Sequence, residues 1–229
     1  MKAAIMQPYF LPYIGYFQLI NAADVFVVYD DVNYIKQGWI NRNRILLNGA
    51  SYMFTLNLKG ASSFKLINGI EIGGNKERLF KTISQAYAKA PFYNDAIGLL
   101  EGIFGSSEKN LAYFIADSIK AISSHLNIGA EIILSSKIEK NNDLKADKKV
   151  INICKILGAT HYVNSIGGEK LYSKETFLDG GINLEFIRSK PISYRQFNNE
   201  FVEWLSIVDV MMFNPVEAVR EMLDQYELI

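Results

Sequence analysis

Two adjacent carboxylates, Asp30 and Asp31, follow the most continuously apolar segment of the chain, residues 25–29. At the carboxyl end of a strand, such a pair can serve as general acid and base or hold a hard cation such as Mg²⁺. Neighbouring residues of an extended chain point in opposite directions, so we expect one aspartate to be catalytic and the other structural. A turn or helix-cap role is the alternative for both.

The next segment, residues 34–44, combines aromatic, amide and basic side chains. If residues 41–44 are extended, Arg42 and Arg44 share one face of the strand, and two guanidinium groups together suit a phosphate or a carboxylate. The neighbouring aromatic rings can stack on a base or a sugar. A solvated edge strand with stacked arginines is the alternative. The residues predicted here to bind substrate are Tyr34, Lys36, Trp39, Asn41, Arg42, Asn43 and Arg44.

A third cluster lies between an expected strand at 3–6 and an expected helix at 13–23. In open α/β sheets, ligands bind beyond the carboxyl ends of the strands, where a helix start also offers free N–H groups to an anion. A rigid aromatic loop that packs on the sheet edge would have the same composition. The predicted binding residues are Gln7, Pro8, Tyr9, Tyr13, Gly15 and Tyr16.

A fourth cluster follows the expected strand at 161–163 and ends in a glycine-containing turn. We expect it to form a second wall of the same cleft, with Asn164, Ser165, Gly167 and Gly168 as binding residues. His161 is the reserve candidate for acid–base catalysis and equally a buried structural histidine. Ser165 is not predicted to be a nucleophile, because its surroundings lack the Gly-x-Ser-x-Gly elbow.

The elements that must position these residues alternate along the chain, which is typical of an α/β fold with a mostly parallel, Rossmann-like sheet. Strands are predicted at 3–6, 25–29, 67–72, 131–134, 161–163 and 184–187, and helices at 13–23, 144–157, 201–213 and 215–226. Asn48-Gly49 predicts a β-hairpin between 43–47 and 51–58. Three periodic helices at roughly 75–128 are expected as an insertion or cap.

We therefore predict a single α/β domain over residues 1–229, in which the segments 7–16, 30–44 and 161–168 form one cleft. The formal net charge is zero, with 24 Lys+Arg and 24 Asp+Glu, which argues against binding of long nucleic-acid tracts. One cysteine, Cys154, and two histidines exclude a disulfide within the chain and all but exclude a Cys/His zinc site. No secretory signal or membrane-length apolar run is present, so a cytoplasmic protein is expected.

The string QPYFLPYIGYFQLINAADVFVVYDDVNYIKQGWINRNRI, residues 7–45, resembles the opening of the WbqC-like family. Further pieces at 158–162, 165–168, 181–186, 194–196 and 205–209 are similar as well, and they add Tyr194 and Gln196 to the predicted binding residues. Asn214-Pro215 departs from the Asn-x-Gly that usually follows in the family. The resemblance implies an association with bacterial O-antigen and lipopolysaccharide genes. It also implies a role in attaching an amino acid, often glycine, to an amino sugar.

These observations together predict a transferase that forms an amide between an amino acid and the amine of a nucleotide-linked amino sugar. One of the two aspartates would accept the proton. Lys36, Arg42 and Arg44 would hold a diphosphate or a tRNA acceptor end, and Asn41, Asn43 or backbone N–H groups would stabilise the oxyanion.

The activated donor would be an aminoacyl-tRNA or an ATP-derived species. The ATP route follows from Tyr13-Ile14-Gly15-Tyr16, which occupies the frame of the His-x-Gly-His motif of nucleotidylyltransferases without its histidines. The alternatives are a Mg²⁺-dependent nucleotidyl- or glycosyltransferase and a non-enzymatic nucleotide-sugar-binding module. The sequence leaves the cofactor and the oligomeric state open.

Overall fold

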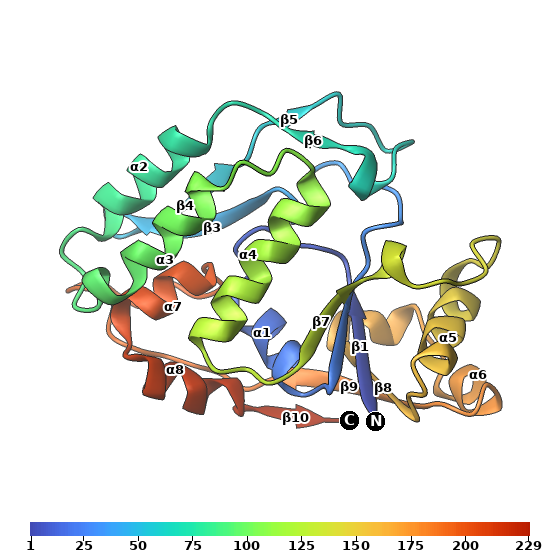
Figure 1. Cartoon of the computed structure of the whole chain (residues 1–229). Helices are drawn as coiled ribbons and strands as arrows, with labels where there is room; N and C mark the ends of the chain where they lie inside the picture. The colour runs from blue at the N-terminus through green and yellow to red at the C-terminus, as the bar shows by residue number, and fades with distance from the viewer.

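Strand β1 (Lys2–Met6) lies in the middle of a six-stranded sheet in a computed structural model that describes residues 1–229 (Figure 1). The strand order is β10-β9-β8-β1-β2-β7. The strands β2 (Val25–Val28), β7 (Glu131–Leu134), β8 (His161–Ser165) and β9 (Asn183–Ser189) run parallel to β1, whereas β10 (Tyr226–Leu228) pairs antiparallel with β9. The predicted α/β fold with a mostly parallel, Rossmann-like sheet is confirmed.

The two faces of the sheet bury alternate residues of the central strands, as the pleat requires. Ala3 and Val27 belong to a core cluster shared with helices α5 (Ala146–Ile156) and α6 (Lys174–Asp179). Ala4 and Phe26 belong to a larger cluster on the opposite face, where helix α1 (Ile14–Asn21) packs. Both faces are therefore covered, which explains why β2 is apolar at every position.

The chain between β2 and β7 leaves the sheet and builds a hairpin and helices beside it (Figure 1). The hairpin pairs β3 (Arg42–Leu47) with β4 (Ala50–Thr55), and Asn48 and Gly49 adopt the positive φ angles of a tight hairpin turn, 52° and 76°. The short strands β5 (Leu58–Lys59) and β6 (Glu71–Ile72) form a second pair. The helices are α2 (Lys76–Tyr87), α3 (Tyr93–Gly105) and α4 (Leu111–His125).

The buried residues of these three helices belong to the same cluster as Ala4 and Phe26 of the sheet. Helix α4 also contacts β7. The C-terminal helices α7 (Ile207–Phe213) and α8 (Val216–Leu223) complete this layer against α3 and α1 respectively. Every helix is too short or too polar to span a membrane.

Three predicted elements were wrong in extent. Residues 67–72, predicted as a strand, form a 3-10 turn at Ile67–Gly69 and the two-residue β6, because the backbone N–H of Asn68 donates to the Asp30 carbonyl. The helix predicted at 201–213 begins only at Ile207. Its N-cap is Ser206, whose N–H donates to the Arg44 carbonyl, and the positive φ of Trp204 interrupts a helix before that point. The helix predicted at 215–226 ends at Leu223, and β10 and α6 were not predicted.

The side chain of Gln18 joins α1 to α8 and to the end of β9 by hydrogen bonds. Its buried amide donates from Nε2 to the Met222 and Gln225 carbonyls at 2.8 and 3.1 Å, and its Oε1 accepts from Ser189 Oγ at 2.6 Å. We predict that Gln18→Leu lowers the free energy of unfolding by about 2–3 kcal/mol, because it removes one buried and two partly buried hydrogen bonds. Gln85→Leu on the exposed face of α2 is the control and should stay within about 0.5 kcal/mol in urea denaturation. Equal effects of the two substitutions would contradict this role.

Candidate functional site

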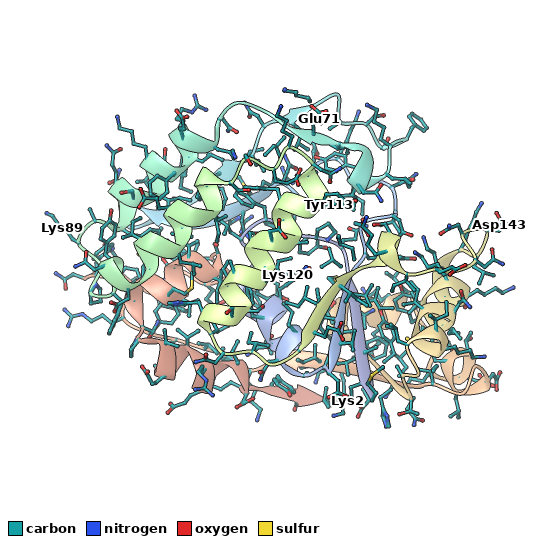
Figure 2. All side chains as sticks on the ribbon, in the orientation of Figure 1. Lys2, Glu71, Lys89, Tyr113, Lys120 and Asp143 are labelled. Carbon is teal, nitrogen blue, oxygen red and sulfur yellow. The ribbon has the colours of Figure 1, made fainter.

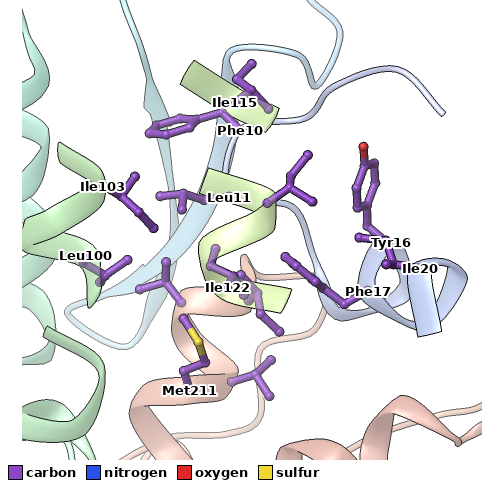
Figure 3. Close-up of a cluster of buried hydrophobic side chains, with 14 of the residues drawn as sticks. Phe10, Leu11, Tyr16, Phe17, Ile20, Leu100, Ile103, Ile115, Ile122 and Met211 are labelled. Atoms are coloured by element: carbon purple, nitrogen blue, oxygen red, sulfur yellow. The ribbon is translucent and has the colours of Figure 1, made fainter. Parts of the chain in front are cut away.

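The loop after β1 dips into the core before it returns to the surface. Phe10 and Leu11 are fully buried (Figure 3), and the ring of Phe10 packs on the aromatic rings of β4, α3 and α4. The Leu11 carbonyl accepts hydrogen bonds from Asn43 Nδ2 at 2.8 Å and Ser206 Oγ at 2.7 Å. Three segments distant in the sequence are thereby held together at one point. Leu11 also has a positive φ of 46°, which turns the following residues outward.

A cavity of about 320 Å³ opens at this junction. We call it the aromatic cavity, and it is lined by Tyr9, Pro12, Tyr13, Trp39, Asn43, Arg44 and Trp204. Two indole and two phenol rings around one space provide faces on which a base or a sugar ring can stack. Tyr9, Tyr13, Trp39, Asn43 and Arg44 are predicted site residues, and the structure brings these five together.

The two arginines of β3, Arg42 and Arg44, differ in whether their guanidinium groups hydrogen-bond within the protein. Both guanidinium groups lie over the Trp39 ring, with Cζ at 5.9 Å from its centroid for Arg42 and 5.3 Å for Arg44. Arg42 donates from Nε to the Gly38 carbonyl at 2.9 Å and from a terminal nitrogen to the Gln37 carbonyl. Arg44 makes no side-chain hydrogen bond or ion pair, and it lines the cavity. Arg44 is therefore the guanidinium available to an anionic ligand.

The side-chain amides of Asn41, just before β3, and Asn43, within β3, hydrogen-bond to other parts of the protein. Asn41 accepts from the Tyr34 hydroxyl at 2.8 Å and donates to the Leu56 carbonyl at 2.7 Å. Asn43 donates to Leu11, so it presents its buried side chain to the cavity with its amide protons partly used. Lys36 is exposed and lies outside the cavity lining. An oxyanion role for either asparagine gains no support from these contacts.

Trp204 was missed by sequence reasoning because residues 201–213 were read as a helix. It is 66% exposed, its ring centroid lies 6.0 Å from that of Tyr13, and its φ angle is 61°. A bulky residue in the left-handed region is an uncommon conformation that concentrates at ligand clamps. The only signal in the sequence was the residue type, because the chain has just two tryptophans.

A second cavity, of about 200 Å³, shares Tyr13 and Trp204 with the first. We call it the apolar cavity. Its lining includes the predicted residue Tyr194, together with Ile14, Ser189, Lys190, Pro191, Ile192, Phe201, Val202, Glu203, Leu205 and Val210. The two cavities are therefore neighbours separated by two aromatic side chains.

A buried carboxyl, Asp209, anchors the wall of the apolar cavity. Its Oδ1 accepts from the Tyr194 hydroxyl and from Gln196 Nε2, each at 2.7 Å, and its Oδ2 accepts from the Tyr87 hydroxyl at 2.7 Å. Burial raises the pKa of Asp209 although the three hydrogen bonds act in the opposite direction. Gln196 is buried and also bonds to Val202, so it builds the wall rather than facing a ligand.

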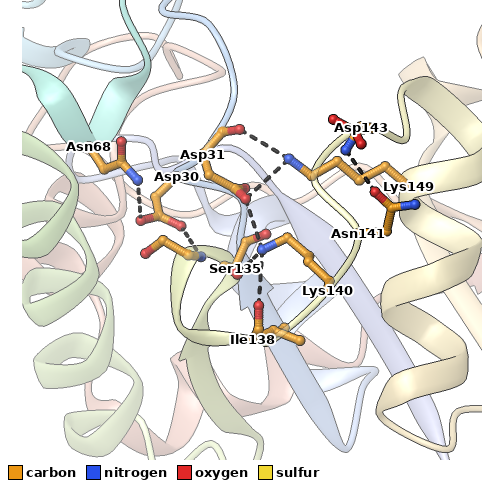
Figure 4. A network of polar contacts seen from close by, with 10 residues as sticks. Asp30, Asp31, Asn68, Ser135, Ile138, Lys140, Asn141, Asp143 and Lys149 are labelled. Atoms are coloured by element: carbon orange, nitrogen blue, oxygen red, sulfur yellow. Dashed lines mark hydrogen bonds and ion pairs between the residues drawn. The ribbon is translucent and has the colours of Figure 1, made fainter.

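Asp30 is fully buried in a polar network at the end of β2 (Figure 4). Its Oδ1 accepts from the Ser136 N–H at 2.9 Å, and its Oδ2 accepts from Asn68 Nδ2 at 3.3 Å. These bonds tie β2 to the turns that follow β7 and precede β6. Both oxygens are used, which favours the structural member of the predicted pair.

Asp31 lies between two buried lysines (Figure 4). Its Oδ2 is 2.8 Å from Lys140 Nζ and 3.1 Å from Lys149 Nζ, and the lysine side chains are only 1% and 9% exposed. Burial alone would raise the pKa of Asp31, but hydrogen bonds and charge from the lysines outweigh it and hold the pKa below its usual value. Two ammonium groups on one carboxylate do not fit a Mg²⁺ ion, so we derive no step through that metal.

The remaining predicted residues lie elsewhere. His161 pairs in register with Lys2 at the amino ends of the strands (Figures 1 and 2), whereas both aspartates follow a carboxyl end, so the structure does not bring His161 to this site. Residues 164–168 form the carboxyl end of β8 and the start of the 3-10 turn after it, and they line neither cavity. The predicted single cleft is therefore present only in part: residues of 7–16 and of 39–44 line the aromatic cavity, whereas Asp30, Asp31 and residues 161–168 line neither cavity. Asn164 accepts from the Ser165 N–H, and Gly168 leaves room for the Asn164 amide.

The other residues predicted to bind in segment 7–16 are Gln7, Pro8, Gly15 and Tyr16, and they line neither cavity. Pro8 is buried, and the Gln7 carbonyl accepts from the buried Tyr16 hydroxyl at 2.9 Å. A Cβ atom added to Gly15 would stand 2.3 Å from the Tyr13 ring, so glycine is needed there for Tyr13 to reach its place between the cavities. These residues support the site from behind.

The comparisons with known proteins match most of the chain. The model of the WbqC-like protein family matches residues 7–221. The chain belongs to the WbqC-like family. This WbqC-like protein is 26% identical over 222 residues to the uncharacterized protein Rv1507c of Mycobacterium tuberculosis, which covers 95% of each chain. No solved structure matches.

The Asp31 cluster of this WbqC-like protein should be a stability element. Asp31→Asn leaves two buried ammonium groups without their counterion, and we predict a loss of about 3 kcal/mol in the free energy of unfolding. Because its pKa is lowered in the folded state, the stability from Asp31 is present above the unfolded-state value of 3.8 and is lost as the pH falls through the folded-state pKa. Asp31→Asn should therefore flatten the acid limb of a stability–pH curve.

The matched control is the exposed pair of Arg188 and Glu227, whose side chains are 53% and 47% exposed. Glu227→Gln should change stability by less than about 1 kcal/mol. In a double-mutant cycle, Lys140→Met combined with Asp31→Asn should cost less than the sum of the two single losses. Strict additivity would show that the two groups do not interact.

Proposed function

We propose that this WbqC-like protein is a transferase that attaches an amino acid to the amine of a nucleotide-linked amino sugar. The observation that carries the proposal is the aromatic cavity, in which the unpaired guanidinium of Arg44 lies beside two tryptophan rings. Stacking faces next to one free cation are what a flat base or sugar ring joined to a diphosphate requires. Glycine remains a candidate for the transferred amino acid, as the family resemblance implies.

In this proposal, Trp39 and Trp204 contact the ring systems of the nucleotide sugar and Arg44 binds the diphosphate. Arg42 supports the Trp39 loop through its bonds to Gln37 and Gly38 rather than binding the ligand. A tRNA acceptor end could use the same stacking surface, since base–aromatic stacking is tolerant of sequence. The biological setting would be the synthesis of bacterial surface polysaccharide such as O-antigen.

The chemical step joins the sugar amine to the activated carboxyl carbon of the amino acid. The new C–N bond forms the amide, the bond to the leaving group breaks, and the amine loses a proton. The leaving group is the tRNA 3′-hydroxyl for an aminoacyl-tRNA donor or AMP for an ATP-derived donor. The donor is therefore the main variable of any activity assay.

A direct test incubates the protein with a uridine-diphosphate-linked 2-amino sugar and either glycyl-tRNA or glycine plus ATP. Mass spectrometry should detect the nucleotide sugar with one aminoacyl residue added, and an N-acetylated sugar should give no product because its amine is blocked. Other amino acids are tested in the same way. Binding of the nucleotide sugar without product for any amino acid and donor would favour a non-enzymatic binding module.

Arg44 should matter for binding more than any other arginine. We predict that Arg44→Ala weakens binding of a diphosphate-linked sugar by about 1–3 kcal/mol, the range for a lost hydrogen bond to a charged group. Arg78→Ala, on the exposed face of α2, is the matched control and should leave the affinity unchanged. Calorimetry that finds equal affinities for both variants, with folding intact, would contradict a ligand role for Arg44.

The acid–base role predicted for one aspartate stays a prediction. Asp31 is the remaining candidate, since its buried Oδ1 has no hydrogen-bond partner, and a proton would have to reach it from a cavity that it does not line. If Asp31 accepts the proton, Asp31→Asn should reduce turnover by about 10²–10⁴, with the lower end favoured by its lowered pKa. Asp30→Asn should change mainly stability. Equal and mild effects on kcat, measured on folded protein, would assign the proton to a group outside this pair.

A further inference from the structure

The apolar cavity has the size of a six-membered carbon ring with room to spare. An engineered protein cavity of about 150 Å³ lined by Leu, Ile and Phe binds benzene, and this cavity holds about 200 Å³. Its walls are mostly apolar, with Ile192, Phe201, Val202 and Val210 among them. A glycine residue has no side chain to fill such a space. The volume therefore matches a bulky apolar group.

The polar atoms of the lining divide into committed and free groups. The Ser189 hydroxyl donates to Gln18 Oε1 at 2.6 Å, and the Tyr194 hydroxyl donates to Asp209 at 2.7 Å. Lys190 and Glu203 are exposed, and their side chains make no hydrogen bond or ion pair. The lining thus offers a ligand one free cation and one free anion, together with the Tyr13 hydroxyl and the Trp204 indole N–H, which also make no hydrogen bond within the protein. The mostly apolar walls offer few hydrogen-bond partners to the many hydroxyl groups of a sugar.

We propose that the apolar cavity binds an α-amino acid with a bulky apolar side chain of the size of phenylalanine or leucine. Lys190 binds its carboxylate, Glu203 binds its ammonium group, and the side chain fills the cavity. This inference rests on the proposed function only in assigning the bound amino acid to the transfer reaction. It goes beyond that function by excluding glycine as the preferred amino acid.

The residues shared by the two cavities would bring the amino acid close to the sugar substrate. Tyr13 and Trp204 line both cavities, so an amino acid in the apolar cavity lies next to a nucleotide sugar in the aromatic cavity. The Trp204 ring lies at this boundary, with its centroid 6.0 Å from that of Tyr13. Two ligands would then meet across two aromatic side chains.

The test is calorimetric titration of the full chain with free L-phenylalanine, L-leucine and glycine. We expect saturable binding of the two apolar amino acids and at least about 100-fold weaker binding of glycine. Phenethylamine, which lacks the carboxylate, and phenylpropionate, which lacks the ammonium group, should each bind about tenfold more weakly than phenylalanine. No binding of either apolar amino acid, or equal binding of glycine, would overturn the proposal.

Substitutions locate the site. Val202→Phe fills the cavity and should weaken phenylalanine binding at least tenfold. Lys190→Gln and Glu203→Gln change exposed side chains and should keep the fold, and each should weaken binding about tenfold. Lys190→Gln should leave phenethylamine binding unchanged, because that ligand has no carboxylate. The matched control is Lys120→Gln on the exposed face of α4 (Figure 2), which should have no effect. Unchanged affinity in both charge variants would overturn the site.

This test separates the two proposals. Phenylalanine binding with the expected responses, but no aminoacylated sugar with any donor, would refute the transfer reaction and retain the amino-acid site. Formation of a glycylated sugar by a protein that does not bind phenylalanine or leucine would retain the transferase and refute this inference.

Discussion

The Leu11 carbonyl, which accepts hydrogen bonds from Asn43 and Ser206, is the point on which both cavities depend. Around it, the Phe10 N–H donates to the Ile40 carbonyl, and the Ser206 N–H donates to the Arg44 carbonyl. The first loop, the start of the hairpin and the segment before α7 are thus joined by backbone groups at one place. Because these groups are buried, leaving any of them unpaired costs free energy, and this cost fixes their mutual arrangement.

As a consequence, the buried polar groups stabilise the fold, whereas the surface aromatic rings remain available to a ligand. Four side-chain amides donate hydrogen bonds to partners within the protein, namely those of Gln18, Asn41, Asn43 and Gln196. Asp30 and Asp209 are likewise surrounded by donors. What is left for a ligand at the two cavities is a set of aromatic faces and three charged side chains without partners, Arg44, Lys190 and Glu203. The chemistry proposed for the protein uses these uncommitted groups.

The fold could largely be predicted from sequence because its signals are local. The apolar runs of β1 and β2 and the Asn48-Gly49 turn each determine their structure within a few residues. The irregular, non-helical form of residues 201–206 could not be predicted, because a hydrogen bond from Ser206 to Arg44, far away in the sequence, holds the end of this segment. Strand β10 has only three residues and gains its order from pairing with β9.

The site was predictable in part for the same reason. Tyr9 and Tyr13 follow β1, and Trp39 and Arg44 belong to the segment that leaves the neighbouring strand β2, so the rule that ligands bind beyond the carboxyl ends of strands indicated this region without coordinates. The partners of Asp31 could not be predicted, since Lys140 and Lys149 come from the segments after β7. Trp204 was hidden by the wrong helix prediction. The position of the two aspartates after β2 could be predicted, whereas their contacts depend on tertiary structure.

The central claim is that the substrate binds in the aromatic cavity between Trp39 and Trp204. These are the only two tryptophans of the chain, so each gives one indole N–H signal in a ¹⁵N-labelled sample, and Trp39→Phe assigns them. On titration with a nucleotide-linked amino sugar, both signals should shift and saturate with the Kd that calorimetry gives for the same ligand. Calorimetric binding that leaves both indole signals in place would contradict the claim.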